Sequence, residues 1–499
     1  MKPLTIITLY SPGPLFEKFL LFLMESALVE RVVIVSQEQV PLEIPGCRIL
    51  VAGPLLSHET LSLILTRIRT KYLLLLPGAQ QISIKPKALE RILGKIESTK
   101  AGLVYSDFFD ESEHGKILHP LNDYQLGSVR DDFDFGAMIL FSVSAVREAV
   151  KKYGVIPGVK FAGLYDLRLK VSIDHSIYHL QKPLYSVMVT DKSSDNGKLF
   201  AYVDPHNEAV QKEMEIVFTD YLKKTGAYLL PNQLREVEQT PTSFPVEASV
   251  VIPVRNRKET IAEAVKSALS QETNFPFNVI VVDNHSTDGT TAILSDLVRQ
   301  YHRLKHIIPK RADLGIGGCW NEALRHKACG CYAVQLDSDD LYSSHRTLQK
   351  MVNMLRQGNY AMVIGSYTLV DSRLEEIPPG LIDHREWTDE NGHNNALRIN
   401  GLGAPRAFNT GLMRKIGFLN VSYGEDYAAA LRISREYRIG RIYESLYLCR
   451  RWSGNTDAAL SIEEANRNNA FKDEIRTIEI LDRKKMNQER ALENCCTLS

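Results

Sequence analysis

The chain has 499 residues, with 60 Lys and Arg balanced by 60 Asp and Glu, so its formal net charge at pH 7 is zero. This balance argues against a nucleic-acid-binding protein, because phosphate binding depends on clustered positive charge. Hydrophobic residues make up 44% of the chain and charged residues 24%, which excludes a disordered protein, and the length suggests about two to four domains.

Residues 1–227 alternate between predicted strands and helices. Apolar runs predict the strands, and apolar residues repeating at intervals of three and four predict the helices. The expected strands are Leu4–Leu9, Val32–Ser36 and Tyr72–Leu76, and the expected helices are Leu15–Leu28 and Lys87–Glu97. This alternation is typical of an α/β layered sheet.

The second half repeats this order after a linker with several prolines, predicted at residues 228–246. The expected strands are Ala248–Val254, Phe277–Asp283 and Tyr332–Leu336, and the expected helices are Glu259–Ser270 and Thr290–Tyr301. Nearly continuous apolar runs suit parallel strands that are buried on both faces. Residues 460–499 predict a charged amphipathic helix that ends in a frayed tail.

Three short matches indicate that the two halves follow one plan. The matched pairs, each separated by the same number of residues, are Pro77 with Asp337, Ser106 with Ser366, and Asp166 with Asp426. We therefore predict two tandem α/β domains, at residues 1–227 and 247–459. The alternative is a pair of unrelated α/β domains that share only a generic periodicity.

Neither a membrane span nor a disulfide framework is expected. No apolar run approaches the roughly 18–20 residues that cross a bilayer, since the run Phe19–Leu23 is followed by Glu25. We expect a cytoplasmic location, and peripheral association with a membrane stays open. The seven cysteines are odd in number and scattered, which favours reduced thiols, and Cys329-Gly-Cys331 lacks the second ligand pair of a zinc site.

The strongest local signal is the acidic turn Asp337-Ser338-Asp339-Asp340, at the carboxyl end of a predicted buried strand. Ligands bind at this end of the strands in open α/β sheets. Carboxylates packed this closely repel one another unless a cation neutralises them, and hard oxygen ligands favour Mg²⁺ or Mn²⁺. The alternative is an acidic surface turn without a ligand.

Three further motifs accompany this turn. One strand ends in Pro253-Val254-Arg255-Asn256, the next ends in Asp283-Asn284-His285-Ser286-Thr287-Asp288-Gly289-Thr290, and Gly424-Glu425-Asp426 lies downstream. In this order, over about Ser249–Asp457, the four motifs resemble those of family 2 glycosyltransferases of the GT-A fold. The resemblance implies two tandem GT-A-like, nucleotide-diphospho-sugar-transferase domains of α/β class, with a C-terminal helical segment.

The resemblance also implies a role for each matching residue. Pro253 and Asn256 would line the nucleotide pocket, and Asp283 would bind the nucleotide's base. Asp337 would bind the ribose or the metal, and Asp339 would bind the metal. Asp426 would be the general base of the reaction, with Glu425 as the competing candidate. Arg450-Arg451-Trp452 resembles the end of the family's Q/R-x-x-R-W motif, although Leu448 stands at its first position. Arg450 or Arg451 would pair with the diphosphate, and an exposed basic turn is the alternative. The incomplete motif favours addition of a single sugar.

The implied reaction is an inverting, metal-dependent transfer of one sugar, with Mn²⁺ or Mg²⁺ as cofactor. The donor would be a nucleotide sugar, with UDP favoured, and the acceptor a glycan or lipid-linked saccharide, as in polysaccharide biosynthesis. A cation stabilises the negative charge of the departing diphosphate, and a carboxylate accepts the proton of the attacking hydroxyl. Two alternatives are a sugar-phosphate nucleotidyltransferase and a non-catalytic scaffold that binds glycan or nucleotide sugar. Segment 254–259 lacks the glycine of the former, and the intact carboxylates argue against the latter.

The first half lacks the acidic turn. It has Pro77-Gly78-Ala79-Gln80 at the corresponding position, so no carboxylate is available for a metal. We predict a degenerate, non-catalytic copy that packs on, stabilises or dimerises the active half, or holds acceptor glycan. In the second half, His384, Trp387 and His393 are further candidates for acceptor contact, with packing inside their loop as the alternative.

Overall fold

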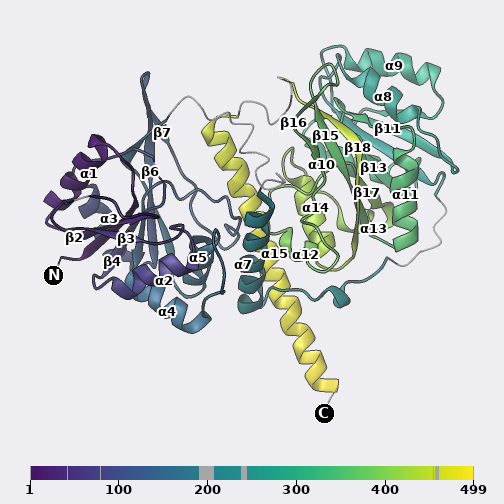
Figure 1. Ribbon diagram of the computed structural model, residues 1–499. Helices are drawn as coiled ribbons and strands as arrows, with labels where there is room; N and C mark the ends of the chain where they lie inside the picture. Colours follow the sequence, from purple (N-terminus) through teal and green to yellow (C-terminus); the bar gives the residue numbers. More distant parts are fainter. Residues whose placement is uncertain are drawn as a thin grey trace. The chain divides into compact units, whose positions relative to one another are not determined.

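The computed structural model describes residues 2–41, 43–78, 80–189, 207–237, 244–452, 455 and 460–497. These residues form two compact units, each with helices packed around a central sheet (Figure 1). The described residues of unit 1 lie within Met1–Leu199, Glu208–Tyr228 and Ser461–Ile480. Those of unit 2 lie within Phe200–Asn207, Leu229–Leu460 and Leu481–Ser499.

Unit 1 contains one sheet in the order β3-β2-β1-β4-β8-β6-β9-β5, with β7 paired to β6. Its strands are β1 (Leu4–Leu9), β2 (Val29–Ser36), β3 (Cys47–Val51), β4 (Tyr72–Leu76), β5 (Ile82–Ile84), β6 (Leu103–Ser112), β7 (Gly115–His119), β8 (Ile139–Ser142) and β9 (Ile177–Met188). Its helices are α1 (Pro14–Glu25), α2 (His58–Arg67), α3 (Ala88–Thr99), α4 (Val143–Tyr153), α5 (Gly163–Asp174) and α7 (Glu208–Thr225).

Unit 2 contains a sheet in the order β12-β11-β10-β13-β17-β15-β18-β14, with β16 paired to β15. Its strands are β10 (Ala248–Val254), β11 (Phe277–Asp283), β12 (Leu304–Ile307), β13 (Tyr332–Gln335), β14 (Leu341–Tyr342), β15 (Met362–Val370), β16 (Glu376–Ile382), β17 (Arg406–Asn409) and β18 (Ile439–Arg450). Its helices are η2 (Pro231–Gln233), α8 (Ile261–Leu269), α9 (Thr290–Gln300), α10 (Ile316–Arg325), α11 (Thr347–Gly358), α12 (Gly392–Asn395), α13 (Thr410–Ile416) and α14 (Glu425–Ser434).

The expected α/β class with two domains is confirmed, and the two sheets have the same strand order. In each, the first strand pairs in parallel with the second and fourth, and the fourth pairs antiparallel with the eighth. The register also agrees, because Leu4 of β1 pairs with Tyr72 and Ala248 of β10 pairs with Tyr332. Descent of both units from one duplicated domain stays a proposal.

The local sequence explains several boundaries. Strands β10 and β11 are buried along almost their whole length, as apolar central strands of a parallel sheet should be. Helix α4 begins where Ser142 accepts a hydrogen bond from the amide of Ala145, and α13 begins where Asn409 accepts one from Leu412. Both caps stand at the end of the antiparallel strand that pairs with the fourth strand of its sheet.

Helix α15 (Ile462–Thr497) forms where an amphipathic helix was expected. It also supplies buried residues to both units, which the sequence did not indicate. In unit 1, buried Asp473 accepts a hydrogen bond from Ser128 Oγ at 2.9 Å and pairs with Arg476 at 2.7 Å. In unit 2, buried Arg483 donates to the carbonyl of His393 at 3.0 Å and to Ser434 Oγ at 3.1 Å.

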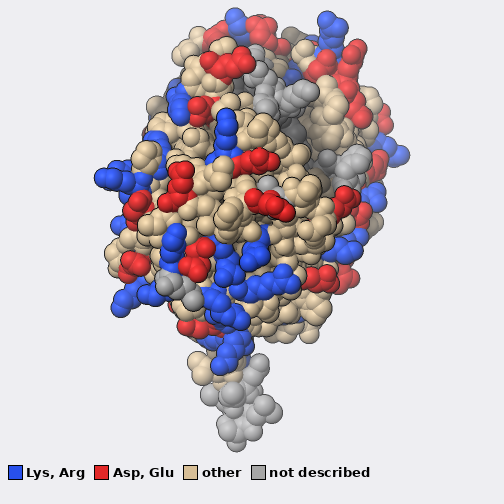
Figure 2. Space-filling view, turned by 60° about the vertical axis from the view of Figure 1, so that its left-hand side comes forward, with Lys and Arg blue, Asp and Glu red and all other residues tan. Residues whose placement is uncertain are grey.

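The surface carries both signs of charge, with Lys and Arg interspersed among Asp and Glu over most of the face in Figure 2. Among the described residues, no helix is both long and apolar enough to cross a membrane. The predicted linker at 228–246 is only partly described. Its first part contains η2, and Leu229 donates its amide to Asn394 Oδ1 at 3.0 Å, so this stretch packs within unit 2. Residues 238–243 lie outside the described part.

Candidate active site

The acidic turn of unit 2 follows β13, beside the carboxyl ends of β10 and β11. The turn is tight, because the amide of Asp340 donates to the carbonyl of Asp337 at 3.3 Å before the chain enters β14. Thr260, just before α8, donates its hydroxyl to the carbonyl of Ser338 at 2.9 Å. Neighbouring elements therefore fix the backbone of the turn at the sheet edge where α/β proteins bind ligands.

Asp337 and Asp340 are held by specific partners. Both oxygens of Asp337 lie 3.0 Å from the Gln335 amide nitrogen, and its backbone amide donates to Tyr447 Oη at 2.9 Å. Asp340 Oδ1 accepts the backbone amide of Arg450 at 2.7 Å. Burial raises the pKa of both carboxyls, and the charges of Asp337 and Asp339 raise that of Asp340 further. A cation at this turn would relieve the repulsion.

Asp339 lies on the more accessible side of the turn. Its Oδ2 is 3.2 Å from Trp452 Nε1, 3.5 Å from the amide nitrogen of Asn455 and 3.6 Å from Arg257 Nε. The described residues contain no group of three or more His, Cys, Asp or Glu side chains arranged to hold a metal. A metal bound here would therefore need ligands from outside these side chains, and the phosphates of a substrate are of that kind.

Asp426 stands in the first turn of α14, after Gly424, whose φ of 79° is in the left-handed region. Its Oδ2 pairs with the guanidinium of Arg406, and its Oδ1 accepts the amide of Tyr427 at 2.7 Å. Arg406 also donates through Nε to Gln335 Oε1 at 2.9 Å, and Gln335 binds Asp337. The structure thus links Asp426 to the acidic turn through two side chains.

Glu425 differs from its neighbour. Its side chain is buried, and desolvation together with the charge of Asp426 raises its pKa to about 8. A carboxyl in this state holds its proton at neutral pH and cannot accept another. The two candidates for the base thus differ in their surroundings: Asp426 is one-third exposed and paired with an arginine, whereas Glu425 is enclosed.

Asp283, expected to bind a base, has no solvent-exposed surface. It accepts the amide of Ser286 at 3.0 Å and the hydroxyl of Thr291 at 2.5 Å, and lies 3.3 Å from His306 Nε2. Burial raises its pKa, but the hydrogen bonds outweigh that effect and lower it overall. In this structure Asp283 stabilises the turn between β11 and α9. The base of a nucleotide could reach its carboxylate only after these hydrogen bonds rearrange.

Asn256 joins the loops that follow β10 and β11. Its φ of 55° lies in the left-handed region, which asparagine tolerates better than most residues. Its Oδ1 accepts the amide of Thr287 at 2.8 Å, and its own amide donates to Ser286 Oγ at 3.0 Å. Pro253 lies in β10 and is half-buried, so these two residues do stand at the predicted sheet edge.

The two arginines expected to meet a diphosphate are placed differently. Arg450 is buried, and its Nη2 lies 2.7 Å from Glu263 Oε2, so a carboxylate already neutralises it. Arg451 is half-buried, and its amide donates to the carbonyl of Val370 at 2.7 Å. The guanidinium next to the acidic turn belongs instead to Arg257, which also lies over the Trp452 ring with 5.9 Å to its centroid.

Sequence reasoning missed Arg257, Gln335 and Arg406. Gln335 carried a signal, because an amide inside an otherwise apolar buried strand requires hydrogen-bond partners. Arg406 begins an antiparallel strand that no motif marked. The candidates His384, Trp387 and His393 prove to be buried, and His393 Nε2 bonds the carbonyl of Leu229 at 2.8 Å. Packing within their loop, the alternative, describes them better than acceptor contact.

Comparison with known proteins identifies this region. The family described as Glycosyl transferase family 2 matches residues 249–416. The EpsE protein of Bacillus subtilis (strain 168), named as a glycosyltransferase, is 32% identical over 124 residues, which cover 25% of this chain and 44% of that protein. The TuaG protein of the same strain, named as a teichuronic acid biosynthesis glycosyltransferase, is 30% identical over 132 residues, covering 26% and 50%. The chain thus spans half the length or less of these relatives.

Solved structures show a weaker similarity. S. aureus TarS 1–349 in complex with UDP-GlcNAc has a TM-score of 0.37 and 23% identity, covering 48% of this chain and 72% of that one. A mannosyltransferase from Pyrobaculum calidifontis in complex with GDP-Man and Mn²⁺ has a TM-score of 0.34 and 18% identity, covering 59% and 87%. From the family match and the named relatives, residues 249–416 of this chain form a family 2 glycosyl transferase domain.

Proposed function

We propose that unit 2 transfers one sugar from a nucleotide-sugar donor to a hydroxyl group, with inversion at the anomeric carbon. The observation that carries the proposal is the connection of the acidic turn to Asp426 through Gln335 and Arg406. The acidic turn, at one end of this connection, can bind a cation that stabilises a charged leaving group. Asp426, at the other end, can accept a proton. Transfer of a sugar from a nucleotide to a hydroxyl group needs both in one site.

The donor's diphosphate belongs at the acidic turn. Asp339 and Asp337 would hold Mn²⁺ or Mg²⁺ there, and the raised pKa of Asp337 and Asp340 agrees with a place built for a cation. When bound, such a cation supplies positive charge to the departing phosphates. Arg257, beside Asp339, adds a second positive group, and we assign it the pairing with the diphosphate that was expected of Arg450 or Arg451.

Asp426 is the proposed general base. It accepts the proton of the acceptor hydroxyl as that oxygen attacks the anomeric carbon from the side opposite the diphosphate, so the configuration inverts. Arg406 keeps the carboxylate in place through their ion pair. The raised pKa of buried Glu425 makes it the less suitable proton acceptor of the two at neutral pH.

The acceptor is proposed to be a glycan or a lipid-linked saccharide. The relative TuaG is named for teichuronic acid biosynthesis, and a polysaccharide product agrees with that name. UDP is the favoured carrier from the resemblance of the motifs, and the incomplete Q/R-x-x-R-W motif favours the addition of one sugar per acceptor.

A donor panel tests the proposal. The full chain is incubated with UDP-, GDP- and dTDP-sugars in the presence of Mn²⁺ or Mg²⁺, and released nucleoside diphosphate is measured. One donor should be slowly hydrolysed by the wild type and spared by Asp339→Ala.

The two alternatives give other results. A nucleotidyltransferase would instead release pyrophosphate from a nucleoside triphosphate and a sugar phosphate. A scaffold would turn over neither kind of substrate. Either result would reject the proposed transfer.

A further inference from the structure

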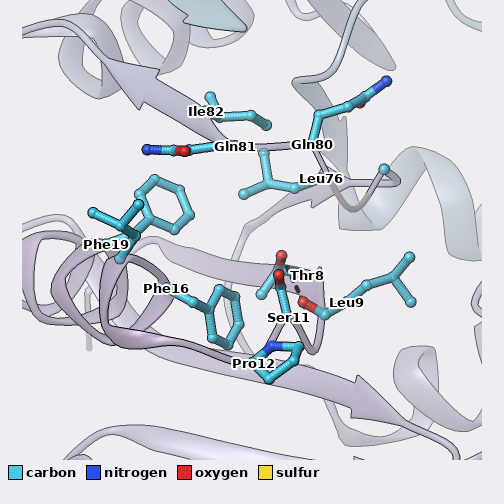
Figure 3. A pocket seen from close by; sticks show the side chains of 12 residues that line it. Thr8, Leu9, Ser11, Pro12, Phe16, Phe19, Leu76, Gln80, Gln81 and Ile82 are labelled. Carbon is cyan, nitrogen blue, oxygen red and sulfur yellow. Dashed lines mark hydrogen bonds between the residues drawn. The ribbon is translucent and has the colours of Figure 1, made fainter. Parts of the chain in front are cut away.

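Unit 1 has a pocket at the carboxyl ends of β1 and β4, beside α1 (Figure 3). Its volume is about 280 Å³, near the lower end of the roughly 300–1,000 Å³ typical of small-ligand sites. The residues that line it are Thr8, Leu9, Ser11, Pro12, Leu15, Phe16, Phe19, Leu76, Gly78, Gln80, Gln81 and Ile82. The pocket lies wholly within unit 1, so it belongs to the half that lacks the acidic turn.

The pocket stands where unit 2 has its candidate active site. Because Leu4 pairs with Tyr72 as Ala248 pairs with Tyr332, positions along the two sheets can be matched one by one. The matched pairs are Leu9 with Pro253, Ser11 with Arg255, Pro12 with Asn256, Pro77 with Asp337, and Gln80 with Asp340. Each ionisable member of the unit 2 set thus has an uncharged counterpart in unit 1.

The replacement of ionisable by uncharged residues determines which ligands the pocket can bind. None of its lining residues is charged, so nothing there neutralises a diphosphate or holds a divalent cation. A nucleotide sugar, the proposed ligand of unit 2, is therefore a poor ligand for this site. The ligand of unit 1 should be electrically neutral.

The lining also offers polar groups that need partners. Thr8 and Ser11 point their hydroxyls toward the space between β1 and Leu76 in Figure 3. The hydroxyl of Ser11 and the amides of Gln80 and Gln81 make no hydrogen bond within the described residues. A hydrocarbon chain would cover these groups without replacing their bonds to water, which is unfavourable. A ligand with several hydroxyl groups would replace those bonds.

Two aromatic rings complete the lining. Phe16 and Phe19 both come from α1 and lie on one side of the pocket (Figure 3). Phe16 is held by an edge contact with Tyr10, with 5.9 Å between ring centroids and 88° between planes. A ring face of this kind packs well against the C–H face of a sugar ring, while amide and hydroxyl side chains bond its hydroxyl groups.

We infer that the pocket of unit 1 binds a neutral saccharide, through the faces of Phe16 and Phe19 and the polar groups of Ser11, Gln80 and Gln81. This binding function goes beyond the transfer reaction proposed for unit 2 and does not depend on it. The neutral monosaccharides N-acetylglucosamine, glucose and galactose, and their β-linked disaccharides, are suitable probes.

Saturation-transfer NMR on the full chain tests the inference. At least one probe should receive saturation from the wild-type protein, and Gln81→Leu should weaken its binding by roughly fivefold to tenfold, the value of one or two hydrogen bonds. Gln37→Leu is the matched control, because Gln37 is exposed in unit 1 and does not line the pocket. It should bind like the wild type.

Other outcomes overturn the inference. Binding of none of the probes, equal binding by wild type and Gln81→Leu, or binding of octanoate in place of every sugar would each reject a saccharide site. The Asp339→Ala variant keeps the two proposals apart, because it should lower donor hydrolysis by about 10²–10³-fold and leave saccharide binding unchanged. Failure of donor hydrolysis in the wild type would therefore reject only the proposed transfer.

Discussion

The two units share a sheet and differ in the few side chains at its carboxyl edge. Where unit 2 has Asp337, Asp340 and Arg406, unit 1 has Pro77, Gln80 and Ile139 at the matching positions of the same strand order. The apolar pattern of the strands is common to both, so it specifies the fold and leaves the chemistry open. Chemistry therefore has to be inferred from the positions that follow each strand.

The carboxylate that both units keep shows this most clearly. Asp166, in α5, is buried and lies 2.8 Å from His58 Nε2, and it also pairs with Lys170 at 2.5 Å. Asp426, in α14, is partly exposed and pairs with Arg406. The same residue type at corresponding places is thus enclosed by His58 and Lys170 in one unit and partly exposed beside Arg406 in the other.

Exchanging each of these carboxylates for an amide gives the largest expected contrast. Asp426→Asn should lower sugar transfer to an added acceptor by about 10²–10⁴-fold, because it removes the proposed base. Asp166→Asn should leave transfer unchanged but destabilise unit 1 by about 3–5 kcal/mol, since it leaves the buried ammonium of Lys170 without its charged partner. Initial rates and chemical denaturation measure the two effects. Equal loss of activity in both variants would show that the sites do not differ in this way.

Truncating one polar side chain at the carboxyl edge of each sheet should have the next largest effect. Asp339→Ala should lower nucleotide release by about 10²–10³-fold, because the diphosphate loses its electrostatic support. Gln80→Ala, at the same sheet edge in unit 1, is the matched control and should keep full nucleotide release. Measured rates that are the same for Asp339→Ala and wild type would contradict the proposed donor site.

Substituting Arg406 tests whether the connection between the acidic turn and Asp426 contributes to catalysis. Arg406→Gln should lower kcat by roughly 10–100-fold with a smaller change in donor KM, because it acts by holding Asp426. Arg406→Lys should recover part of that loss. An unchanged kcat in Arg406→Gln would rule out a positioning role, and a melting curve shows whether the variant is folded.

The smallest expected effect is on the pH dependence of stability, and it comes from two histidines of unit 1. His119 lies 2.6 Å from Asp110 and 3.6 Å from Asp134, and His179 lies between Asp107 and Asp123 at 2.9 and 2.8 Å. Burial lowers the pKa of both imidazoles, but hydrogen bonds and charge from these carboxylates outweigh it and raise the pKa above 6.5.

A histidine whose pKa is higher in the folded than in the unfolded protein stabilises the folded state. Its contribution is complete at pH values below the pKa of the unfolded state. That contribution is lost as the pH rises through the folded pKa. The melting temperature of unit 1 should therefore fall as the pH rises above about 6.5, the unperturbed pKa of histidine, and less steeply in the double variant His119→Gln, His179→Gln. An equally steep fall in that variant would assign the effect to other groups.

Much of the architecture could be predicted from the sequence. The strands Leu4–Leu9, Tyr72–Leu76, Ala248–Val254 and Phe277–Asp283 were predicted with the same bounds, because a buried parallel strand is an uninterrupted apolar run. Helix ends were less accurate. The first helix ends at Glu25 because β2 already begins at Val29, whereas its apolar periodicity continues to Leu28.

The site was harder to predict, because its partners come from distant segments. Nothing in the local sequence tells that Arg406 faces Asp426 or that Glu263 neutralises Arg450. Asp283 shows the converse: its motif suggested a ligand contact, whereas the fold turns the carboxylate inward. Tertiary pairing decides such cases, and one sequence read alone contains too little information about it.

The long C-terminal helix has a practical consequence for anyone dividing this protein. Since α15 gives Asp473 to one unit and Arg483 to the other, neither unit is a single uninterrupted stretch of chain. An expression plasmid that stops at Leu460 would leave the carbonyl of His393 and the hydroxyl of Ser434 without Arg483, and one that covers only residues 249–416 would lack Ser434 as well. Fragments for crystallisation should keep residues 481–497, supplied in trans as a peptide if necessary.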